Sequence, residues 1–523
     1  MGRQEEMVSE RLKKISELRK LGINPYPNRY DVKNHASDLQ SKYASIKAEE
    51  KTKDSVKVAG RLLTIRDLGK IAFGVLEDGS GKIQILLQDG ETPEKVFEFF
   101  KKFIDSGDFI GVEGIVFRTK RGELSVLVNK LTLLTKSVLP VPEQFYGLKD
   151  EEEKLRMRYI DIILNPAVKQ MFVRKSKFWQ SIRDFLLSKG FMEVETPVIE
   201  TTPGGAEARP FITHHNALDF AVSLRISPEL WLKRLMVAGY PKIFEIGRIF
   251  RNEGMDAEHL QDYTQMEFYW AYADYNDGMR FVEEMYKKVA QDTFGTLKFK
   301  IKEFDIDLGK KWEVYDYVGI IKKMTDIDVL KTNLSEVEDK LAELQVEYDK
   351  KGFNLTRGVD NLWKHCRKKI AGPGFLINVP VMMEPLAKRM ESNPELVERF
   401  QIILAGSELG KGFSELNDPI DQLGRFDEQA KLREAGDEEA QMKDDDFVEA
   451  LKYGMPPTCG FGVSERLFSF LEGKPIRETV MFPLMKPAQK QDSKKEQPKE
   501  EKIEQPAEQK KEKKSKQSKG GKK

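Results

Sequence analysis

Cysteine is almost missing from this sequence of 523 residues, which contains only Cys366 and Cys459. Because the two lie far apart without metal-type spacing, we expect neither a disulfide framework nor a structural zinc site. No stretch approaches the roughly 20 apolar residues of a membrane span, and the first residues have no apolar signal core. The net charge is only +1, which argues against a uniformly basic nucleic-acid binder but allows a local basic surface. These absences predict a reduced, cytoplasmic protein without a membrane part.

The length and the local composition predict several domains, because 523 residues are too many for one ordinary core. Residues 1–55 are expected to form a helical extension, and the prolines after Leu139 begin a linker over 139–160. Residues 488–523 contain 13 lysines and 7 acidic residues but almost no apolar ones. Such a composition cannot bury a core and predicts a disordered, Lys-rich tail.

Residues 56–138 are rich in short β-branched runs separated by Gly-Asp and Gly-Ser turns. This pattern predicts a small all-β barrel of the OB type. Barrels of this kind bind nucleic acid by stacking bases on aromatic side chains.

Residues 244–272 have the pattern of a β-hairpin with an unusual polar face. In its second arm, alternate positions separate Met266, Phe268, Trp270 and Tyr272 from Tyr263, Gln265, Glu267 and Tyr269. The second face therefore carries a carboxylate between aromatic rings, and Arg251 and Glu253 stand at the mouth of the hairpin loop. The planar fork of an arginine suits a phosphate. A surface hairpin with a solvated salt bridge is the alternative.

Two later segments also carry candidate chemistry. Residues 456–487 form a Gly-rich strand-to-helix junction, and Arg466 in the first turn of the helix suits an anion. Residues 400–418 place Glu408 and Glu415 in a strand pair with no nearby cation in sequence. Two such carboxylates demand a metal or a charged substrate, and oxygen ligands favour magnesium.

These segments together resemble the class II aminoacyl-tRNA synthetases. The strings Phe250-Arg251-Asn252-Glu253-Gly254 and Tyr263-Thr264-Gln265-Met266-Glu267 are similar to their motif 2, and residues 268–275 resemble the lysyl-tRNA synthetase version. A helix over 172–189 and a strand over 191–196 that runs into Pro197 resemble motif 1, the dimer element. Residues 456–487 resemble motif 3, and Gly412-Phe413-Ser414-Glu415-Leu416-Asn417-Asp418 resembles the lysine pocket.

The resemblance, which covers about residues 8–487, implies an α+β multidomain fold. It consists of an N-terminal OB-fold β-barrel that binds the anticodon and a class II catalytic domain over 161–487. The catalytic domain is expected to be an antiparallel sheet flanked by helices, with a helical insertion at about 330–372. The implied reaction is the ATP-dependent activation of L-lysine and its transfer to the 3′ end of tRNA(Lys), with Mg²⁺ as cofactor and a homodimer as the assembly.

The resemblance also assigns roles to residues. For ATP it implies Arg251, Glu253, His259, Tyr263 and Arg466, with the two arginines acting in catalysis. For the amino acid it implies Gly205, Glu229, Glu267, Tyr269, Phe413 and Glu415. It implies Glu408 and Gln401 for the metal. For the anticodon it implies Phe73, which would stack a base, together with Gln84 and Glu123, and a place in the core is the alternative for Phe73 taken alone.

Some positions depart from the lysyl pattern. Gln401 replaces a second metal-binding glutamate, Lys411 replaces an asparagine, and the motif 3 string before Arg466 is one residue short. The loop from His259 to Tyr263 departs toward aspartyl- and asparaginyl-type enzymes, which are therefore one alternative. A synthetase-like binding protein that has lost catalysis is the other.

Overall fold

The computed structural model describes residues 3–142, 148, 150–254, 256–350 and 352–487. The chain up to Pro483 forms one compact unit. The predicted disordered tail, 488–523, lies outside the described residues. Within the described ranges, no helix is both long enough and apolar enough to cross a membrane.

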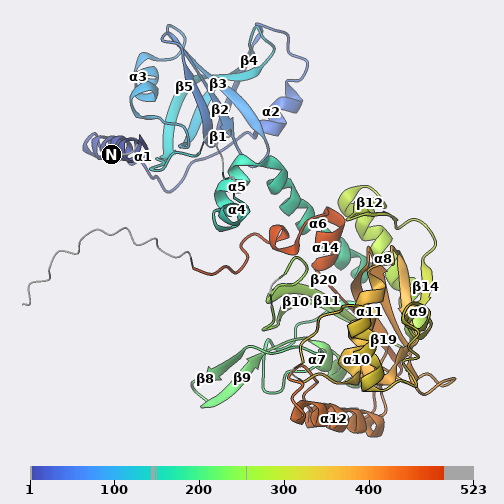
Figure 1. The fold of residues 1–523 in the computed structure, drawn as a ribbon. Helices are drawn as coiled ribbons and strands as arrows, with labels where there is room; N and C mark the ends of the chain where they lie inside the picture. The colour runs from blue at the N-terminus through green and yellow to red at the C-terminus, as the bar shows by residue number, and fades with distance from the viewer. Residues whose placement is uncertain (1–2, 143–147, 149, 255, 351, 488–523) are drawn as a thin grey trace, which may run out of the picture. The chain divides into compact units, whose positions relative to one another are not determined.

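The N-terminal part contains a closed β-barrel, drawn in blue to cyan in Figure 1. The strand order around the barrel is β1-β2-β3-β5-β4, in which β3 and β5 run parallel and the other pairs antiparallel. Aliphatic side chains such as Leu62, Ile85 and Val112 fill its interior. This is the predicted OB-fold. Its strands are β1 (Lys51–Asp67), β2 (Ile71–Glu77), β3 (Lys82–Gln88), β4 (Phe109–Arg118) and β5 (Leu124–Thr135), accompanied by α1 (Arg3–Lys20), α2 (Ala36–Lys42) and α3 (Glu94–Phe103).

The segment after the barrel is more helical than a plain linker, with α4 (Glu151–Arg156), α5 (Arg158–Leu164) and α6 (Pro166–Ser188). The helix predicted from residue 172 begins earlier, at Pro166, because the fixed φ of proline suits the first helical position. The strand predicted over 191–196 is only β6 (Met192–Glu193). Thr196 leaves the strand because its N–H and hydroxyl donate to the Glu245 carboxylate at 3.1 and 2.6 Å.

The C-terminal part is built on an eight-stranded sheet. Its order is β14 (Glu313–Asp316), β15 (Gly374–Ile377), β18 (Arg399–Leu404), β19 (Ser407–Ser414), β20 (Thr458–Ser464), β11 (Asp262–Ala271), β10 (Lys242–Phe250) and β6. The pairs at the two edges are parallel and the pairs between them are antiparallel. The predicted hairpin is β10 and β11, in which Glu245 faces Glu267 across the strand pair.

The two faces of this sheet are covered differently, and the alternation in β11 decides which side chain goes where. Met266 and Phe268 pack into a core with α6 and α8 (Tyr275–Phe294). Tyr269 faces the opposite side, toward a second core that includes α7 (Glu229–Val237) and α9 (Tyr317–Thr325). Tyr272 was expected beside Met266, but this is wrong. It follows the end of β11 with a φ of 63° and is 80% exposed.

The predicted insertion contains two helices, α10 (Leu334–Glu343) and α11 (Leu355–Arg367). The first of them ends at Glu343, and the chain then turns at Gln345, whose φ is 54°. The remaining elements are β7 (Ile199–Glu200), β8 (Ile212–His215), β9 (Phe220–Leu224), β12 (Lys298–Ile301), β13 (Phe304–Asp307), β16 (Val379–Pro380), the 3-10 helix Val381–Met383, β17 (Leu396–Val397), α12 (Pro419–Glu434), α13 (Asp445–Leu451), α14 (Arg466–Glu472) and the 3-10 helix Ile476–Thr479.

Candidate functional site

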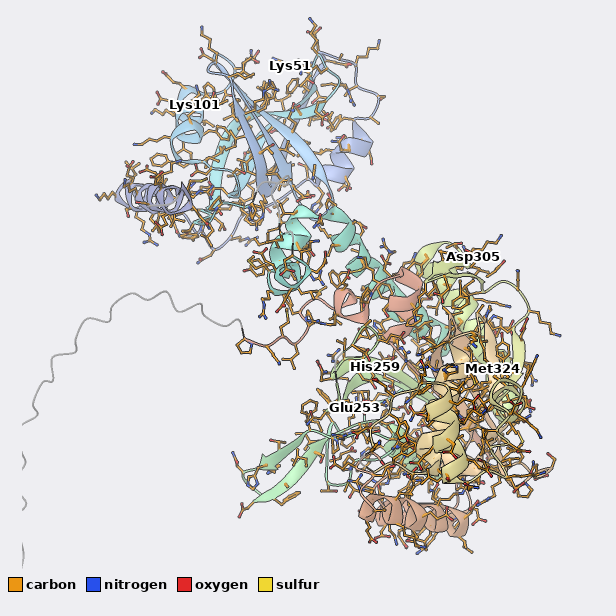
Figure 2. All side chains as sticks on the ribbon, viewed as in Figure 1. Lys51, Lys101, Glu253, His259, Asp305 and Met324 are labelled. Carbon is orange, nitrogen blue, oxygen red and sulfur yellow. The ribbon has the colours of Figure 1, made fainter. Side chains whose placement is uncertain are left out.

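A cavity of about 390 Å³ is lined by side chains of β11, β19 and β20, together with residues of α7, α11 and the segment after β10. Figure 2 marks Glu253 and His259, two lining residues from that segment. All residues predicted for ATP, the amino acid and the metal line this cavity: Gly205, Glu229, Arg251, Glu253, His259, Tyr263, Glu267, Tyr269, Gln401, Glu408, Phe413, Glu415 and Arg466. The alternative of a solvated hairpin is wrong for Glu267, which is only 5% exposed.

Glu267 is a buried carboxylate held by hydrogen bonds. Ser227 Oγ donates to Oε1 at 2.7 Å, Gln265 Nε2 donates to the same oxygen at 2.6 Å, and the Tyr269 hydroxyl donates to Oε2 at 3.1 Å. Burial and the nearby Glu229 carboxylate raise the pKa of Glu267 to about 7, although the hydrogen bonds act to lower it. The site therefore holds a carboxylate that is poised to change charge near neutral pH.

Lys233 supplies the cation that the sequence had not placed beside Glu415. It lies one helical turn after Glu229 in α7 and is fully buried. Its Nζ is 2.7 Å from Glu229 Oε1 and also contacts the Glu415 carboxylate directly. Although burial acts to lower the pKa of Lys233, the two carboxylates raise it, so the ammonium is charged. The expectation that Glu415 has only a metal or a substrate as its positive partner is therefore wrong.

The wall around these carboxylates is tightly packed. Gly205 has a φ of 84°, and its N–H donates to Gln441 Oε1 at 3.2 Å. A Cβ on Gly205 would lie 2.7 Å from the Cβ of Glu229, so only glycine fits there. The Phe413 ring lies 5.3 Å below the Lys233 ammonium, within the range of a cation–π contact.

The predicted ATP residues occupy another part of the cavity lining. The guanidinium of Arg251 lies 5.7 Å from the Tyr263 ring centroid, and its Nε donates to the Ile226 carbonyl at 3.4 Å. Burial raises the pKa of Glu253 despite the nearby Arg251. His259 is half-exposed and lies 2.8 Å from an Asp256 carboxylate oxygen through Nδ1. Arg251 thus offers its Nη groups to an anion.

Arg466 meets a carboxylate that the sequence had not singled out. Glu258, from the loop between β10 and β11, accepts from Arg466 Nη2 and from Lys302 Nζ, the latter at 2.8 Å. Burial acts to raise the pKa of Glu258, but the Arg466 and Lys302 cations outweigh it and lower the pKa to about 2. Since α14 is only seven residues long, an anion at this place would have to be bound by side chains.

Glu408 fits a metal ligand better than Gln401 does. The Trp363 indole Nε1 donates to Glu408 Oε1 at 2.5 Å. Burial acts to raise the pKa of Glu408, but Arg367 and Arg399 lower it, so this carboxylate is ionised. Gln401 Oε1 instead accepts a hydrogen bond from Arg399. The described residues contain no cluster of three or more His, Cys, Asp or Glu that could hold a metal, so only a metal shared with substrate phosphates would fit here.

Lys411 does not oppose the predicted ammonium site. Its Nζ lies 3.3 Å from Glu384 Oε1, and Arg399 Nε reaches the same carboxylate at 3.1 Å. The repulsion that Lys411 could exert on a cationic substrate is therefore offset by Glu384.

Several residues of the site were missed from the sequence, chiefly Lys233, Glu258, Lys302 and Trp363. Among these, only Lys233 could have been found from the sequence, because its spacing of four from Glu229 places both side chains on one helix face. Trp363 lies in α11 of the insertion and lines the cavity. The contacts of Glu258 and Lys302 join segments far apart in sequence.

The three residues predicted for the anticodon lie in or beside the barrel strands. Phe73 in β2 packs against a small apolar cluster of Leu86, Phe117 and Leu127, apart from the main barrel core. Gln84 in β3 accepts from Ser125 Oγ at 2.8 Å. The Glu123 backbone closes the turn before β5 through hydrogen bonds with Thr119. The alternative that Phe73 belongs to the main core is not supported.

Comparison with known proteins agrees with this architecture. Residues 150–486 match the family model "tRNA synthetases class II (D, K and N)", and residues 56–134 match the model of an OB-fold nucleic acid binding domain. The chain is 43% identical over 494 residues to the lysine–tRNA ligase of Thermotoga maritima, covering 94% of this chain and 98% of that protein. It is 42% identical over 498 residues to the lysine–tRNA ligase of Nostoc punctiforme, covering 92% and 88%. Since the likeness spans both parts at this level of identity, the chain belongs to the class II tRNA synthetases of the lysine–tRNA ligase family.

Proposed function

We propose that the protein activates L-lysine with ATP to form lysyl-adenylate and then transfers the lysyl group to the 3′ end of tRNA(Lys). The observation that carries this proposal is the charge of the cavity. Three buried carboxylates, Glu229, Glu267 and Glu415, line the cavity, and the buried cation Lys233 pairs with Glu229 and Glu415. L-lysine brings two ammonium groups, which together with Lys233 would match the three carboxylates of the cavity, while the substrate's own carboxylate would be left to face ATP.

This count of charged groups in the cavity also disfavours the aspartyl-type alternative. A substrate with a carboxylate side chain needs a free cation in the pocket, because an unpaired buried charge costs several kcal/mol, on the order of 3 to 5. Lys233 is already shared between Glu229 and Glu415. Aspartate would add a further negative charge to this cluster, whereas lysine reduces the excess.

The proposed chemistry follows from the two ends of the cavity. The substrate carboxylate attacks the α-phosphorus of ATP in line, and the bond to the β-phosphate oxygen breaks to release pyrophosphate. Arg251 would stabilise the charge on the α-phosphate, and Arg466 would bind the terminal phosphates. A ribose hydroxyl of the terminal tRNA adenosine then attacks the carbonyl carbon, and AMP leaves.

Magnesium fits this site through Glu408, whose pKa is lowered. When bound with ATP, it would neutralise phosphate charge. Gln401 is a poor second ligand because its oxygen accepts from Arg399. Other side chains of the cavity would position these groups. Trp363 orients Glu408 through its indole N–H, and Tyr263 lines the cavity, where it would stack on adenine.

For tRNA, we propose that the OB-fold barrel reads the anticodon, with Phe73 stacking a base and Gln84 and Glu123 bonding base edges. The small apolar cluster around Phe73, outside the main barrel core, supports this role.

We also propose a homodimer formed by the motif 1 elements, because apolar side chains of these and neighbouring segments are exposed, among them Val173 at 56%, Met192 at 43%, Ile199 at 54% and Ile212 at 73%. A role in protein synthesis would place the protein in the cytoplasm.

ATP–pyrophosphate exchange across the amino acids tests the proposal. We expect exchange that depends on L-lysine and is abolished in Arg251→Ala. Exchange with L-aspartate but not L-lysine would refute lysine as the substrate. Exchange with no amino acid, together with no detectable lysyl-adenylate, would instead favour the binding protein that has lost catalysis.

A further inference from the structure

Two cations from distant segments converge on the Glu258 carboxylate. Arg466 comes from the start of α14, and Lys302 comes from the turn between β12 and β13. The Ser407 hydroxyl, next to Glu408, lies 3.2 Å from Glu258 Oε2 and 3.5 Å from Lys302 Nζ. Glu258 and Arg466 both line the cavity, and Lys302 is joined to this lining by its hydrogen bond to Glu258. A single carboxylate therefore joins the two cations beside the predicted phosphate region.

Lys302 is held toward this point by its backbone and its surroundings. Its φ of 53° places it in the left-handed region at the tip of the hairpin, and its ammonium lies 5.0 Å from the Phe470 ring. The other lysine of this hairpin with a described ion pair, Lys300, lies instead 3.2 Å from Asp305, which Figure 2 labels. The two lysines are thus chemically alike but differ in what they face.

Arg466 also retains donor capacity. Its Nε is buried and makes no hydrogen bond with any part of the chain that the structure describes. A guanidinium offers five donors in a planar fork, and a carboxylate uses at most a pair of them. A terminal phosphate offers three strong acceptor oxygens and more negative charge than a carboxylate, so it can compete for the same cations.

We propose that Lys302 is a further positioning residue for ATP, which together with Arg466 binds the terminal phosphates, and that Glu258 is an internal competitor for both cations. The inference rests on the proposed use of ATP. Lys302 would act on the β- and γ-phosphates, which become the pyrophosphate leaving group, and would not act on AMP. Glu258 would keep the two cations close together and yield them to the incoming phosphates.

Titration calorimetry of the full chain with ATP and with AMP tests this proposal in five variants: Lys302→Met, Glu258→Gln, the double variant, Lys302→Arg combined with Glu258→Gln, and Lys300→Met as the matched control. Because a partly exposed charge contact is worth up to about 1 kcal/mol, we expect Lys302→Met to weaken ATP binding about fivefold. Glu258→Gln should strengthen ATP binding about threefold or more, since an amide is a weaker competitor than a carboxylate. AMP affinity should stay unchanged in all variants, and Lys300→Met should match the wild type.

The double variant separates direct contact from an indirect role. If Lys302 binds phosphate, Lys302→Met lowers ATP affinity in the Glu258→Gln background as well, and Lys302→Arg restores it. An unchanged ATP affinity in that background would overturn the inference, because Lys302 would then act only by holding Glu258. An equal loss of AMP and ATP affinity would also overturn it. Failure of the wild type to bind ATP at all would show that the proposed function itself is wrong.

Discussion

The affinity of the protein for L-lysine should fall steeply below about pH 7, because Glu267 must be ionised to pair with a substrate ammonium. Its pKa is raised to about 7 by burial and by Glu229. The groups that face it are Glu229 and Glu415, which disfavour its charge, and the Ser227, Gln265 and Tyr269 donors, which favour it. A protonated Glu267 would offer the substrate ammonium no negative charge.

The size of the effect follows from one-site titration. With a pKa of about 7, the ionised fraction of Glu267 falls about tenfold from pH 8 to pH 6, so the apparent Kd should rise about tenfold, or about 1.4 kcal/mol. The side-chain ammonium of lysine stays protonated over this range, and any loss of the proton on its α-ammonium would act in the opposite direction, weakening binding as pH rises. The change therefore reports on the protein.

Titration calorimetry with L-lysine alone, between pH 5.5 and pH 8.5, measures this dependence without nucleotide. Glu207→Gln is the matched control. Glu207 lines the same cavity and its pKa is also raised to about 7 by burial, but it pairs with Arg357 at 3.1 Å. We expect the control to keep the wild-type pH dependence, and Glu267→Gln to bind lysine weakly with a flat profile.

Two results would refute this reasoning. A wild-type affinity that does not change between pH 6 and pH 8 would show that Glu267 is ionised throughout this range. A slope that survives in Glu267→Gln but disappears in Glu207→Gln would assign the titration to Glu207.

Three further predictions use the same contacts. Glu267→Gln should raise the free energy of unfolding at pH 8 by about 1 to 3 kcal/mol and have little effect near pH 4.5. The reason is that a carboxyl group whose pKa is raised in the folded state lowers stability as pH rises from about 4.5 through 7. Equal urea unfolding curves for the variant and the wild type at pH 8 would contradict this. Lys233→Met should lower the unfolding free energy by about 3 to 5 kcal/mol, since it leaves Glu229 and Glu415 buried without their cation; a loss under 1 kcal/mol in urea would oppose it. Phe73→Ala should weaken tRNA(Lys) binding by about 1 to 3 kcal/mol in fluorescence anisotropy, and an equal loss of lysine-dependent exchange would count against an anticodon role.

The part of the site that could be predicted from the sequence is the part set by local periodicity. Alternation in β11 places Gln265, Glu267 and Tyr269 on one face, because successive side chains of a strand point to opposite sides. The same rule puts Met266 and Phe268 into the core between the sheet and α6. Such assignments need no knowledge of the partner strands.

The missed features depend on contacts between distant segments. Glu258 and Arg466 are 208 positions apart, and Trp363 meets Glu408 from a helix in the insertion. No spacing rule brings such pairs together. The predicted end of the strand over 191–196 was wrong for a related reason. Thr196 lies outside the observed strand, because its hydroxyl donates to Glu245, a residue of another segment. Local preference is overridden where a buried carboxylate needs donors.

At each end of the cavity, the charged side chains form ion pairs with an internal counterion, Lys233 at one end and Glu258 at the other. The two counterions differ in how easily a substrate can replace them. Lys233 is fully buried between two carboxylates, so its removal would leave both uncompensated. Glu258 lies on a loop with a partly exposed side chain, and on the proposed function its two cations would accept phosphate in its place. Binding at the phosphate end would therefore be an exchange, whereas binding at the lysine end would be an addition. Among the described residues, no cation lies within ion-pair distance of Glu267, although Lys233 already serves Glu415. On the proposed function, recognition of the substrate ammonium then depends more on Glu267 than on Glu415, although Glu415 belongs to the string that resembles the lysine pocket of the family.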